Sequence, residues 1–157
     1  MNSIDAYVSG VISGDIVACR WVRLACERHE KDRNTEDFAY RFDDEQAYKA
    51  INFIQLLPHT KDKWAARNEK LHLEPWQCFV VGSIFGWVRK SDGLRRFREA
   101  YVEVPRKNGK SHIAAGIGIK CMVADDVHGA EVYAGATTEK QAWEVFRPAR
   151  IMAKNTP

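Results

Sequence analysis

The sequence feature that most constrains the fold is the stretch Val104–Ser111, which reads Val-Pro-Arg-Lys-Asn-Gly-Lys-Ser. It follows a strand-like run and opens an apolar, helix-like segment, which is the layout of a phosphate-binding (Walker A) loop. The full pattern requires Gly at the first position and Gly-Lys-Ser/Thr at the end. Val104 takes the first position, so the match is partial and the neighbouring sequence must decide whether the loop holds a nucleotide.

The residue types in the loop suit phosphate binding. A helix N-terminus offers unpaired backbone N–H groups and the positive end of its dipole. Gly109 lets the backbone approach phosphate oxygens, the Lys110 ammonium can reach the β- and γ-phosphates, and the Ser111 hydroxyl can bind Mg²⁺. Arg106 and Lys107 add positive charge, and an Arg in this place can contact the γ-phosphate.

The alternative is that Asn108 and Gly109 form a common turn ahead of an ordinary helix. Two neighbours of the loop favour the nucleotide site: a strand candidate over residues 98–104 and a helix expected over residues 110–124. That helix is rich in small residues, which would let it pack tightly on a sheet. They are Ala114, Ala115, Gly116 and Gly118.

The charge distribution also points to the loop. The net charge of the 157 residues is only +3, but eight Lys/Arg face three acids between Arg89 and Lys110. Between Glu27 and Glu45, eight acids face four bases. Positive charge therefore gathers where phosphates would sit, although an unevenly charged solvated surface would give the same counts.

The four cysteines suggest a reducing compartment. None form a Cys-x-x-Cys pair, and we expect buried thiols. A zinc site on Cys26 and His29 would need two further ligands, and none stands at a suitable spacing. The N-terminus lacks the pattern of a signal peptide, and the longest apolar run, residues 78–88, is about half a membrane span. We therefore expect a soluble, cytoplasmic protein.

The N-terminal part is predicted to be helical. One helix is expected over residues 15–30, followed by a polar connector over 31–42. Its apolar stripe consists of Val17, Trp21 and Leu24. A second helix is expected over residues 44–57, with Asp43 as its N-cap and Pro58 as its stop.

A third helix is predicted to start at Pro75, a residue favoured at the first helical position. It should run to Val88 and be buried, because it is apolar almost all round. A polar stretch over residues 58–70 precedes this helix, and a turn over residues 91–93 follows it.

The second half alternates strand and helix. Strands are expected over residues 98–104 and 131–135, with a helix over 110–124 between them and a last helix opening at Thr138. Pro148 is predicted to kink or break the last helix. This order predicts an α/β fold with parallel strands joined by a right-handed crossover.

A motor site also needs an apolar strand that ends in acidic residues. The run Cys121–Asp126 has the composition, but it continues the loop helix with no room for a crossover. Asp125 and Asp126 are therefore interpreted as the end of that helix. Because a two-stranded parallel sheet would leave both edges open, the chain is predicted to be the front part of a longer protein.

Three segments, Leu73–Gln77, Val104–Ser111 and Ala134–Ala142, stand in a characteristic order. Together they resemble the N-terminal ATPase domain of the large terminase subunit of tailed bacteriophages and prophages. The resemblance spans roughly residues 70–155, and the helical lead-in is also similar. It implies a P-loop NTPase of the additional-strand type with an incomplete parallel sheet. Residues 1–70 would form the lead-in, and 71–157 the first part of the ATPase domain.

The resemblance assigns roles to particular residues. The family's loop lacks the first glycine and carries an Arg, so Val104 and Arg106 become expected. Gln77, with Trp76 beside it, would contact adenine, since an amide offers both a donor and an acceptor. The alternative role of Trp76 is packing in the hydrophobic core. The implied catalytic residues are Lys110 and Arg106. The implied nucleotide-binding set is Trp76, Gln77, Arg106, Lys107, Asn108, Gly109, Lys110 and Ser111, with Ser111 on Mg²⁺.

The segment Thr137–Gln141 resembles a loop that couples ATP state to DNA in related translocases, through Thr137, Thr138 and Gln141. It would equally serve as an N-cap, with Thr138 bonding the backbone and Gln141 closing a capping box. Candidate DNA contacts, by position alone, are Lys140, Arg147 and Arg150.

The implied function is ATP-driven translocation of double-stranded viral DNA into a procapsid in the bacterial cytoplasm. The implied cofactors are ATP and Mg²⁺, and the implied partners are DNA, the portal, the small terminase subunit and further copies in a ring. Without the acidic element, this chain should bind ATP weakly and hydrolyse it poorly or not at all. The alternatives are another helicase-like DNA translocase or a non-catalytic prophage module that binds DNA or a protein partner.

Overall fold

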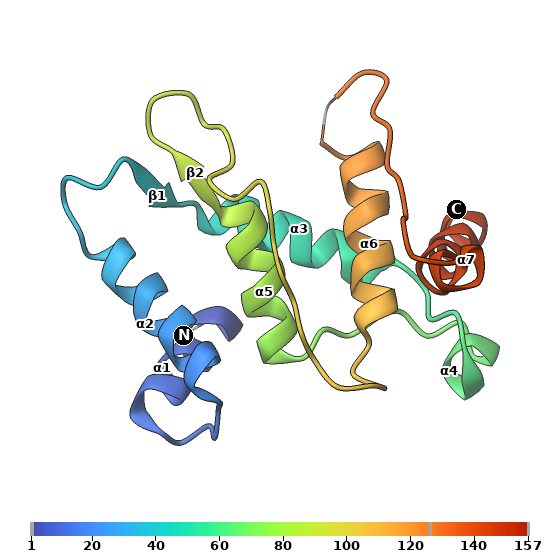
Figure 1. Cartoon of the computed structure of the whole chain (residues 1–157), viewed down its shortest axis with the longest axis horizontal. Coiled ribbons are helices and arrows are strands. Elements are labelled where there is room, and N and C mark those ends of the chain that lie inside the picture. The colour runs from blue at the N-terminus through green and yellow to red at the C-terminus, as the bar shows by residue number, and fades with distance from the viewer. Residues whose placement is uncertain (1, 126, 157) are drawn as a thin grey trace. The chain divides into compact units, whose positions relative to one another are not determined.

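The computed structural model describes residues 2–125 and 127–156. The chain forms two compact units, each built from two stretches of sequence. The first unit comprises Met1–Ile51 and Leu73–Ala100, and the second comprises Asn52–His72 and Tyr101–Pro157. The elements in Figure 1 are α1 (Ser3–Ser13), α2 (Arg20–Arg33), β1 (Tyr40–Phe42), α3 (Asp44–Leu56), α4 (Asp62–Ala66), α5 (Pro75–Gly86), β2 (Trp87–Arg89), α6 (Lys110–Val123) and α7 (Glu139–Asn155).

In the first unit, α1 packs against α2 and α5 (Figure 1). A helical lead-in was expected over residues 1–70, but the apolar periodicity placed no helix before residue 15. Asn2 starts α1, because its side-chain oxygen accepts a hydrogen bond from the Asp5 N–H at 2.8 Å. Gly14 ends it in the left-handed conformation with φ of 92°. The buried stripe of α1 consists of Ile4, Val8 and Val11.

The helix predicted over residues 15–30 begins later, at Arg20, and buries a different face. Val17 is 98% exposed and Trp21 is 74% exposed, so the predicted stripe was wrong. The buried residues of α2 are Cys26 and His29. The segment carries two adjacent apolar stripes, and periodicity alone could not choose between them.

The predicted helix at Pro75 is confirmed as α5, with Glu74 and Gln77 forming a capping box. Glycines on α5 let its neighbours come close. A Cβ on Gly82 would clash with Ile4 Cδ1, and one on Gly86 would lie 2.9 Å from Ala47 Cβ. These glycines therefore let α1 and the start of α3 approach the α5 backbone closely.

The α5 helix ends at Gly86, two residues before the predicted Val88, because Trp87 turns extended with φ of −78° and ψ of 111°. Residues 87–89 become β2, which pairs antiparallel with β1 so that Phe42 faces Trp87. The Trp87 side chain is 2% exposed, and its Nε1–H donates to His29 Nδ1 at 3.1 Å. The connector predicted over 31–42 thus supplies a strand that covers the core.

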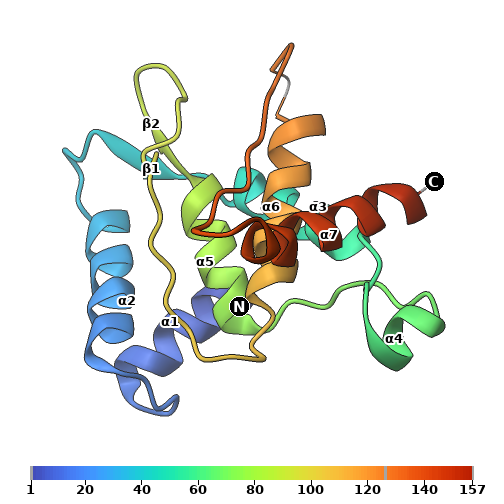
Figure 2. The ribbon, with the colours of Figure 1, turned by 45° about the vertical axis from the view of Figure 1, so that its right-hand side comes forward.

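In the second unit, α7 runs across α6 and packs against it (Figure 2). The prediction of a helix over 110–124 is confirmed by α6. Its small residues serve another purpose than expected, since a Cβ on Gly116 would lie 2.9 Å from Ile54 Cγ2 of α3. The α6 helix therefore packs closely on a helix rather than on a sheet.

The helix predicted over 44–57 is confirmed as α3, and Asp43 Oδ1 caps it by accepting from the Gln46 N–H at 3.1 Å. Of the kink or break predicted at Pro148, the break was wrong, because the α7 helix runs through this residue. Pro148 and Met152 are buried, and this packing offsets the one backbone hydrogen bond that proline removes.

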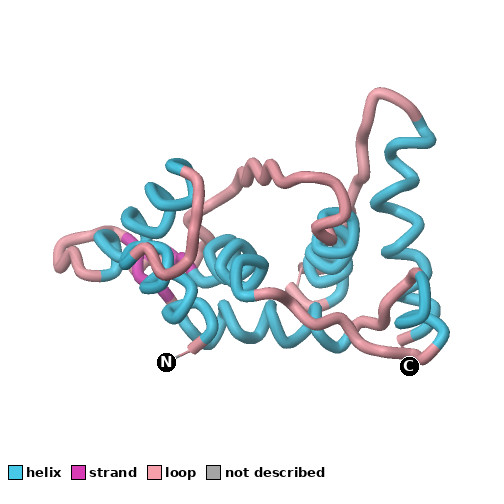
Figure 3. Tube along the Cα trace, turned by 90° about the horizontal axis from the view of Figure 1, so that it is seen from below, coloured by secondary structure: helices cyan, strands magenta, loops and turns pink. Residues whose placement is uncertain are grey.

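The predicted strands over 98–104 and 131–135 are not strands in this structure. Figure 3 shows both segments as loop, and the strand pair β1–β2 is the one sheet found among the described residues. Tyr101 is 88% exposed and Tyr133 is 83% exposed. Strands need ladder partners and a covered face to be stable, and these segments have neither in the described chain. The predicted parallel sheet is therefore absent from it.

Candidate functional site

The loop ahead of α6 has a backbone shaped to receive an anion. Lys107 has φ of 69° and Gly109 has φ of 73°, whereas Asn108 between them does not have a positive φ. Backbone that alternates in this way turns successive N–H groups toward one concavity. Gly109 is also the N-cap of α6, and its carbonyl accepts from the Ile113 N–H at 3.0 Å. The first N–H groups of α6 thus face the same end as the loop.

Side chains of the loop hold it in shape. Lys110 Nζ donates to the carbonyls of Val104 at 2.6 Å and Pro105 at 2.8 Å. Asn108 Nδ2 donates to the carbonyls of Pro105 and Arg106, both at 3.3 Å. The Lys110 ammonium is therefore folded inside the loop that carries it, next to the N-terminus of α6.

This loop opens on a cavity of about 800 Å³, which we call the loop cavity. Four basic and two acidic side chains face it, along with two histidines and one tryptophan. The lining residues are His59, Lys61, Asp62, Trp64, Arg106, Lys107, Gly109, Lys110, Ser111, His112 and Glu144. Five predicted residues, Arg106, Lys107, Gly109, Lys110 and Ser111, are thus brought together.

The opposite side of the loop cavity comes from residues 59–64, which the sequence did not point to. The His59 ring stacks on Trp64 with centroids 5.7 Å apart. Thr60 Oγ1 and His112 Nε2 are 2.9 Å apart and share a hydrogen bond. Burial lowers the pKa of His112, and the nearby His59 and Lys61 lower it further. The ring thus favours its neutral form and ties this segment to the first turn of α6.

An ion pair links the segment to α7. Lys61 Nζ lies 4.0 Å from Glu144 Oε2, and both side chains line the loop cavity. The same two residues also line a second cavity of about 390 Å³, the α7 cavity, together with Lys140, Trp143, Arg147 and Pro148. Two of the three candidate DNA contacts are therefore neighbours on one surface, and Arg150 is exposed elsewhere on α7.

Gln77 and Trp76 belong to the first unit. Gln77 is 8% exposed, and its Oε1 accepts from the Glu74 N–H at 3.0 Å. Trp76 is half-buried. The structure thus gives Gln77 a capping role, and the adenine contact of these two residues stays a prediction.

The segment before α7 forms the predicted N-cap. Thr138 Oγ1 accepts from the Gln141 N–H at 3.3 Å. The Gln141 side chain does not close the box on Thr138; its Oε1 accepts from the Thr137 hydroxyl at 2.5 Å. The capping interpretation of Thr138 is confirmed, while coupling to DNA stays a prediction.

The acidic run after α6 behaves as a helix end. The α6 helix stops at Val123, and Asp125 forms an ion pair with the buried Lys120 of α6. Asp126 lies outside the described residues. Within residues 2–125 and 127–156, no cluster of His, Cys, Asp and Glu side chains has the makings of a metal site.

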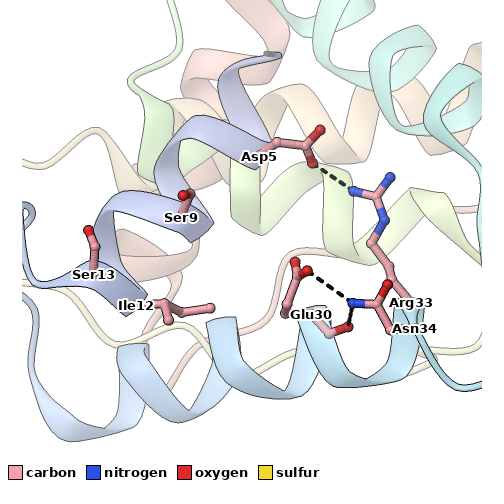
Figure 4. Close-up of a pocket in the computed structure, with 7 residues that line it drawn as sticks. All are labelled: Asp5, Ser9, Ile12, Ser13, Glu30, Arg33 and Asn34. Atoms are coloured by element: carbon pink, nitrogen blue, oxygen red, sulfur yellow. Dashed lines mark hydrogen bonds and ion pairs between the residues drawn. The ribbon is translucent and has the colours of Figure 1, made fainter.

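A further cavity, of about 560 Å³, lies between α1 and α2 of the first unit (Figure 4). Four of its polar side chains are paired with one another: Arg33 Nη1 lies 2.6 Å from Asp5 Oδ1, and Asn34 Nδ2 donates to Glu30 Oε1 at 3.0 Å. The Arg33–Asp5 pair fastens α2 to α1, and the Asn34–Glu30 bond closes the end of α2, so both contacts have a structural role.

None of the helices in the described chain is long and apolar enough to span a bilayer. A comparison with curated proteins and with solved structures gave no match. The family model described as "Terminase large subunit, ATPase domain" matches residues 75–157, just over half of the chain. The match covers the loop, α6 and α7, which build the loop cavity together with residues 59–64. The chain belongs to the family of terminase large subunit ATPase domains.

Proposed function

We propose that the loop cavity binds ATP with Mg²⁺. The observation that carries this proposal is the position of Lys110 and the N-terminus of α6 at a cavity of about 800 Å³ with an excess of basic side chains. A helix N-terminus and an ammonium group together favour a polyphosphate. The family supports nucleotide binding, and the identity of the nucleotide and metal is our proposal.

The loop residues would divide the work. The backbone N–H groups from Lys107 to Gly109 would cradle phosphate oxygens. Lys110, which now donates to two loop carbonyls, would redirect its ammonium to the β- and γ-phosphates. Arg106 would stabilise charge on the γ-phosphate as it is transferred. Ser111, half-buried in the first turn of α6 and facing the cavity, fits a hydroxyl ligand of Mg²⁺.

We further propose that the chain acts in the motor that moves double-stranded DNA into a procapsid in a bacterial cell. Thr137, Thr138 and Gln141 would couple the nucleotide state to DNA, and Gln77 with Trp76 would contact adenine. The portal, the small terminase subunit and copies of the same chain in a ring would be partners. These proposals rest on the terminase family.

Nucleotide titration tests the binding proposal. The Lys110→Ala variant should bind ATP on the order of 10- to 100-fold more weakly, because a charged hydrogen bond to phosphate is worth about 1.5–3 kcal/mol. The matched control is Lys154→Ala in the last turn of α7, which should leave affinity unchanged. Equal ATP affinity in the Lys110→Ala variant and the wild type would contradict the proposal. Circular dichroism would verify that both variants fold.

Hydrolysis is a separate question. We expect the chain alone to turn over ATP slowly or not at all, because Asp125 ends α6 in a pair with Lys120 and does not supply the acidic element that a motor site needs. Rapid turnover that Lys110→Ala abolishes would show that another carboxylate supplies the missing acidic group.

The α7 cavity supports one alternative function, a module that binds DNA without using ATP. Lys140 and Arg147 face this cavity beside Trp143, a combination of charge and aromatic surface that nucleic acids favour. DNA binding that weakens with salt but ignores ATP and the Lys110→Ala change would favour that alternative.

A further inference from the structure

The loop cavity contains a carboxylate that should oppose its ligand. Glu144 lines the cavity from α7, where its negative charge would repel phosphate oxygens. In the structure this charge is met by Lys61 Nζ at 4.0 Å. When a polyphosphate enters the cavity, Lys61 therefore has two possible partners, Glu144 and the phosphate oxygens.

The ion pair between Lys61 and Glu144 is weak enough for Lys61 to change partner. The Lys61 and Glu144 side chains are 58% and 65% exposed, and their separation is at the limit for an ion pair. An exposed pair of this kind contributes little to stability because water and salt screen it. A polyphosphate carries several negative charges and would outcompete a single carboxylate for the ammonium.

The backbone of Lys61 is held in place while its side chain is free to change partner. Thr60, next to it, is hydrogen-bonded to His112 at 2.9 Å, and His112 directly follows Ser111. The backbone N–H of His59 donates to the Glu69 carbonyl at 2.8 Å. Lys61 is thus anchored opposite the first turn of α6.

We propose that Lys61 is a phosphate-contacting residue that exchanges Glu144 for the bound polyphosphate, an inference that rests on the proposed ATP site. Glu144 is then released on α7, with Lys140 four residues before it and Arg147 three residues after it. Both spacings allow a new ion pair along the helix. Because Glu144, Lys140 and Arg147 all line the α7 cavity, nucleotide binding would change the charge of that surface.

ATP titration of the full chain with Mg²⁺ tests this exchange. Lys61→Gln should weaken ATP binding about tenfold, the loss of one charged hydrogen bond. Lys63→Gln is the matched control, because Lys63 lies over the Trp64 ring at 5.1 Å rather than in the cavity lining, and it should change affinity less than about twofold. Glu144→Gln should tighten ATP binding about threefold by freeing Lys61.

The double variant Lys61→Gln/Glu144→Gln separates exchange from simple repulsion. If Glu144 acts by holding Lys61, the gain from Glu144→Gln disappears once Lys61 is gone. Two results overturn the inference while leaving the proposed function intact: Lys61→Gln and Lys63→Gln weakening binding equally, or Glu144→Gln weakening binding, which would assign the carboxylate to Mg²⁺. A wild-type chain that binds no ATP, with no loss in Lys110→Ala, overturns both.

Discussion

The two units place their histidines in opposite surroundings. The first unit seals His29, 3% exposed, among the rings of Phe42, Phe79 and Trp87. The second unit leaves His59, Trp64 and the loop lysines open on a cavity. His29 Nδ1 accepts from Trp87 while its buried Nε2 has no hydrogen-bond partner, so the ring belongs to a closed aromatic core, whereas an open polar group can take a ligand. Substitutions in the first unit should therefore change stability, and those around the loop cavity should change binding.

The largest expected effect is in the core of the first unit. Trp87→Ala should lower the free energy of unfolding by about 3–5 kcal/mol, because it leaves a cavity and removes the hydrogen bond to His29. Trp21→Ala is the matched control on the same unit, since Trp21 is 74% exposed, and it should cost less than about 0.5 kcal/mol. Equal costs in urea denaturation would contradict the comparison.

Acid should destabilise the first unit through His29. Burial lowers the pKa of His29 to about 4, and the neighbouring Arg33 lowers it as well. In the unfolded chain, the His29 ring binds a proton below about pH 6.5. In the folded chain, the same ring stays neutral down to about pH 4. Stability is therefore full above pH 6.5 and falls by about 3 kcal/mol as the pH drops toward 4.

Urea denaturation at a series of pH values measures this loss. His29→Leu should flatten the slope between pH 6.5 and 4, whatever its effect on stability at neutral pH. A wild-type slope that persists in His29→Leu would assign the acid sensitivity to other groups.

Alanine substitutions at Gly86 and Gly135 should differ in their effect on stability, by less than the Trp87 and Trp21 pair. Gly86→Ala should cost about 1–3 kcal/mol, because its Cβ would lie 2.9 Å from Ala47 Cβ in a packed core. Gly135 of the second unit has no heavy atom within 4 Å of the added Cβ. Gly135→Ala should therefore be nearly neutral in thermal unfolding. A large cost at Gly135 would indicate packing in that segment that the structure does not show.

The smallest effect concerns the cap of α7. Thr138→Ala should cost about 1 kcal/mol or less, because the Gln141 N–H loses the hydroxyl acceptor at 3.3 Å but keeps the Thr138 carbonyl at 3.1 Å, while Thr138→Ser should keep most of the stability. Both variants should bind ATP like the wild type if Thr138 serves only as a cap. A loss of affinity in Thr138→Ala alone would support a link between this segment and the nucleotide.

Local rules predicted much of this molecule. The starts of α3, α5, α6 and α7 follow from Asp43, Pro75, Gly109 and Thr138, each of which acts on the backbone within a few residues. The loop residues were recognised for the same reason, since helix start, glycine and lysine lie within one short segment. Five of them do line one cavity.

What escaped prediction depends on contacts between distant residues. Thr60 and His112 meet across 52 positions, so no local pattern could place residues 59–64 beside the loop. The clue was the histidine that directly follows Gly-Lys-Ser, a polar ring at a helix start that needs a partner. The strands over 98–104 and 131–135 failed in the opposite way: their composition suits a sheet, but pairing depends on neighbours that the described chain does not offer.

The four cysteines differ in exposure, so the rate at which each thiol reacts reports the opening of the structure around it. Cys19 is exposed at the start of α2, whereas Cys26 and Cys78 are buried in the first unit, and burial raises the pKa of Cys26 to about 11. Cys121 is half-buried on α6 of the second unit. A thiol reagent should modify Cys19 at once and each remaining sulfur only as fast as its surroundings open. Peptide-resolved labelling would thus time the opening of each unit within one unmodified sequence.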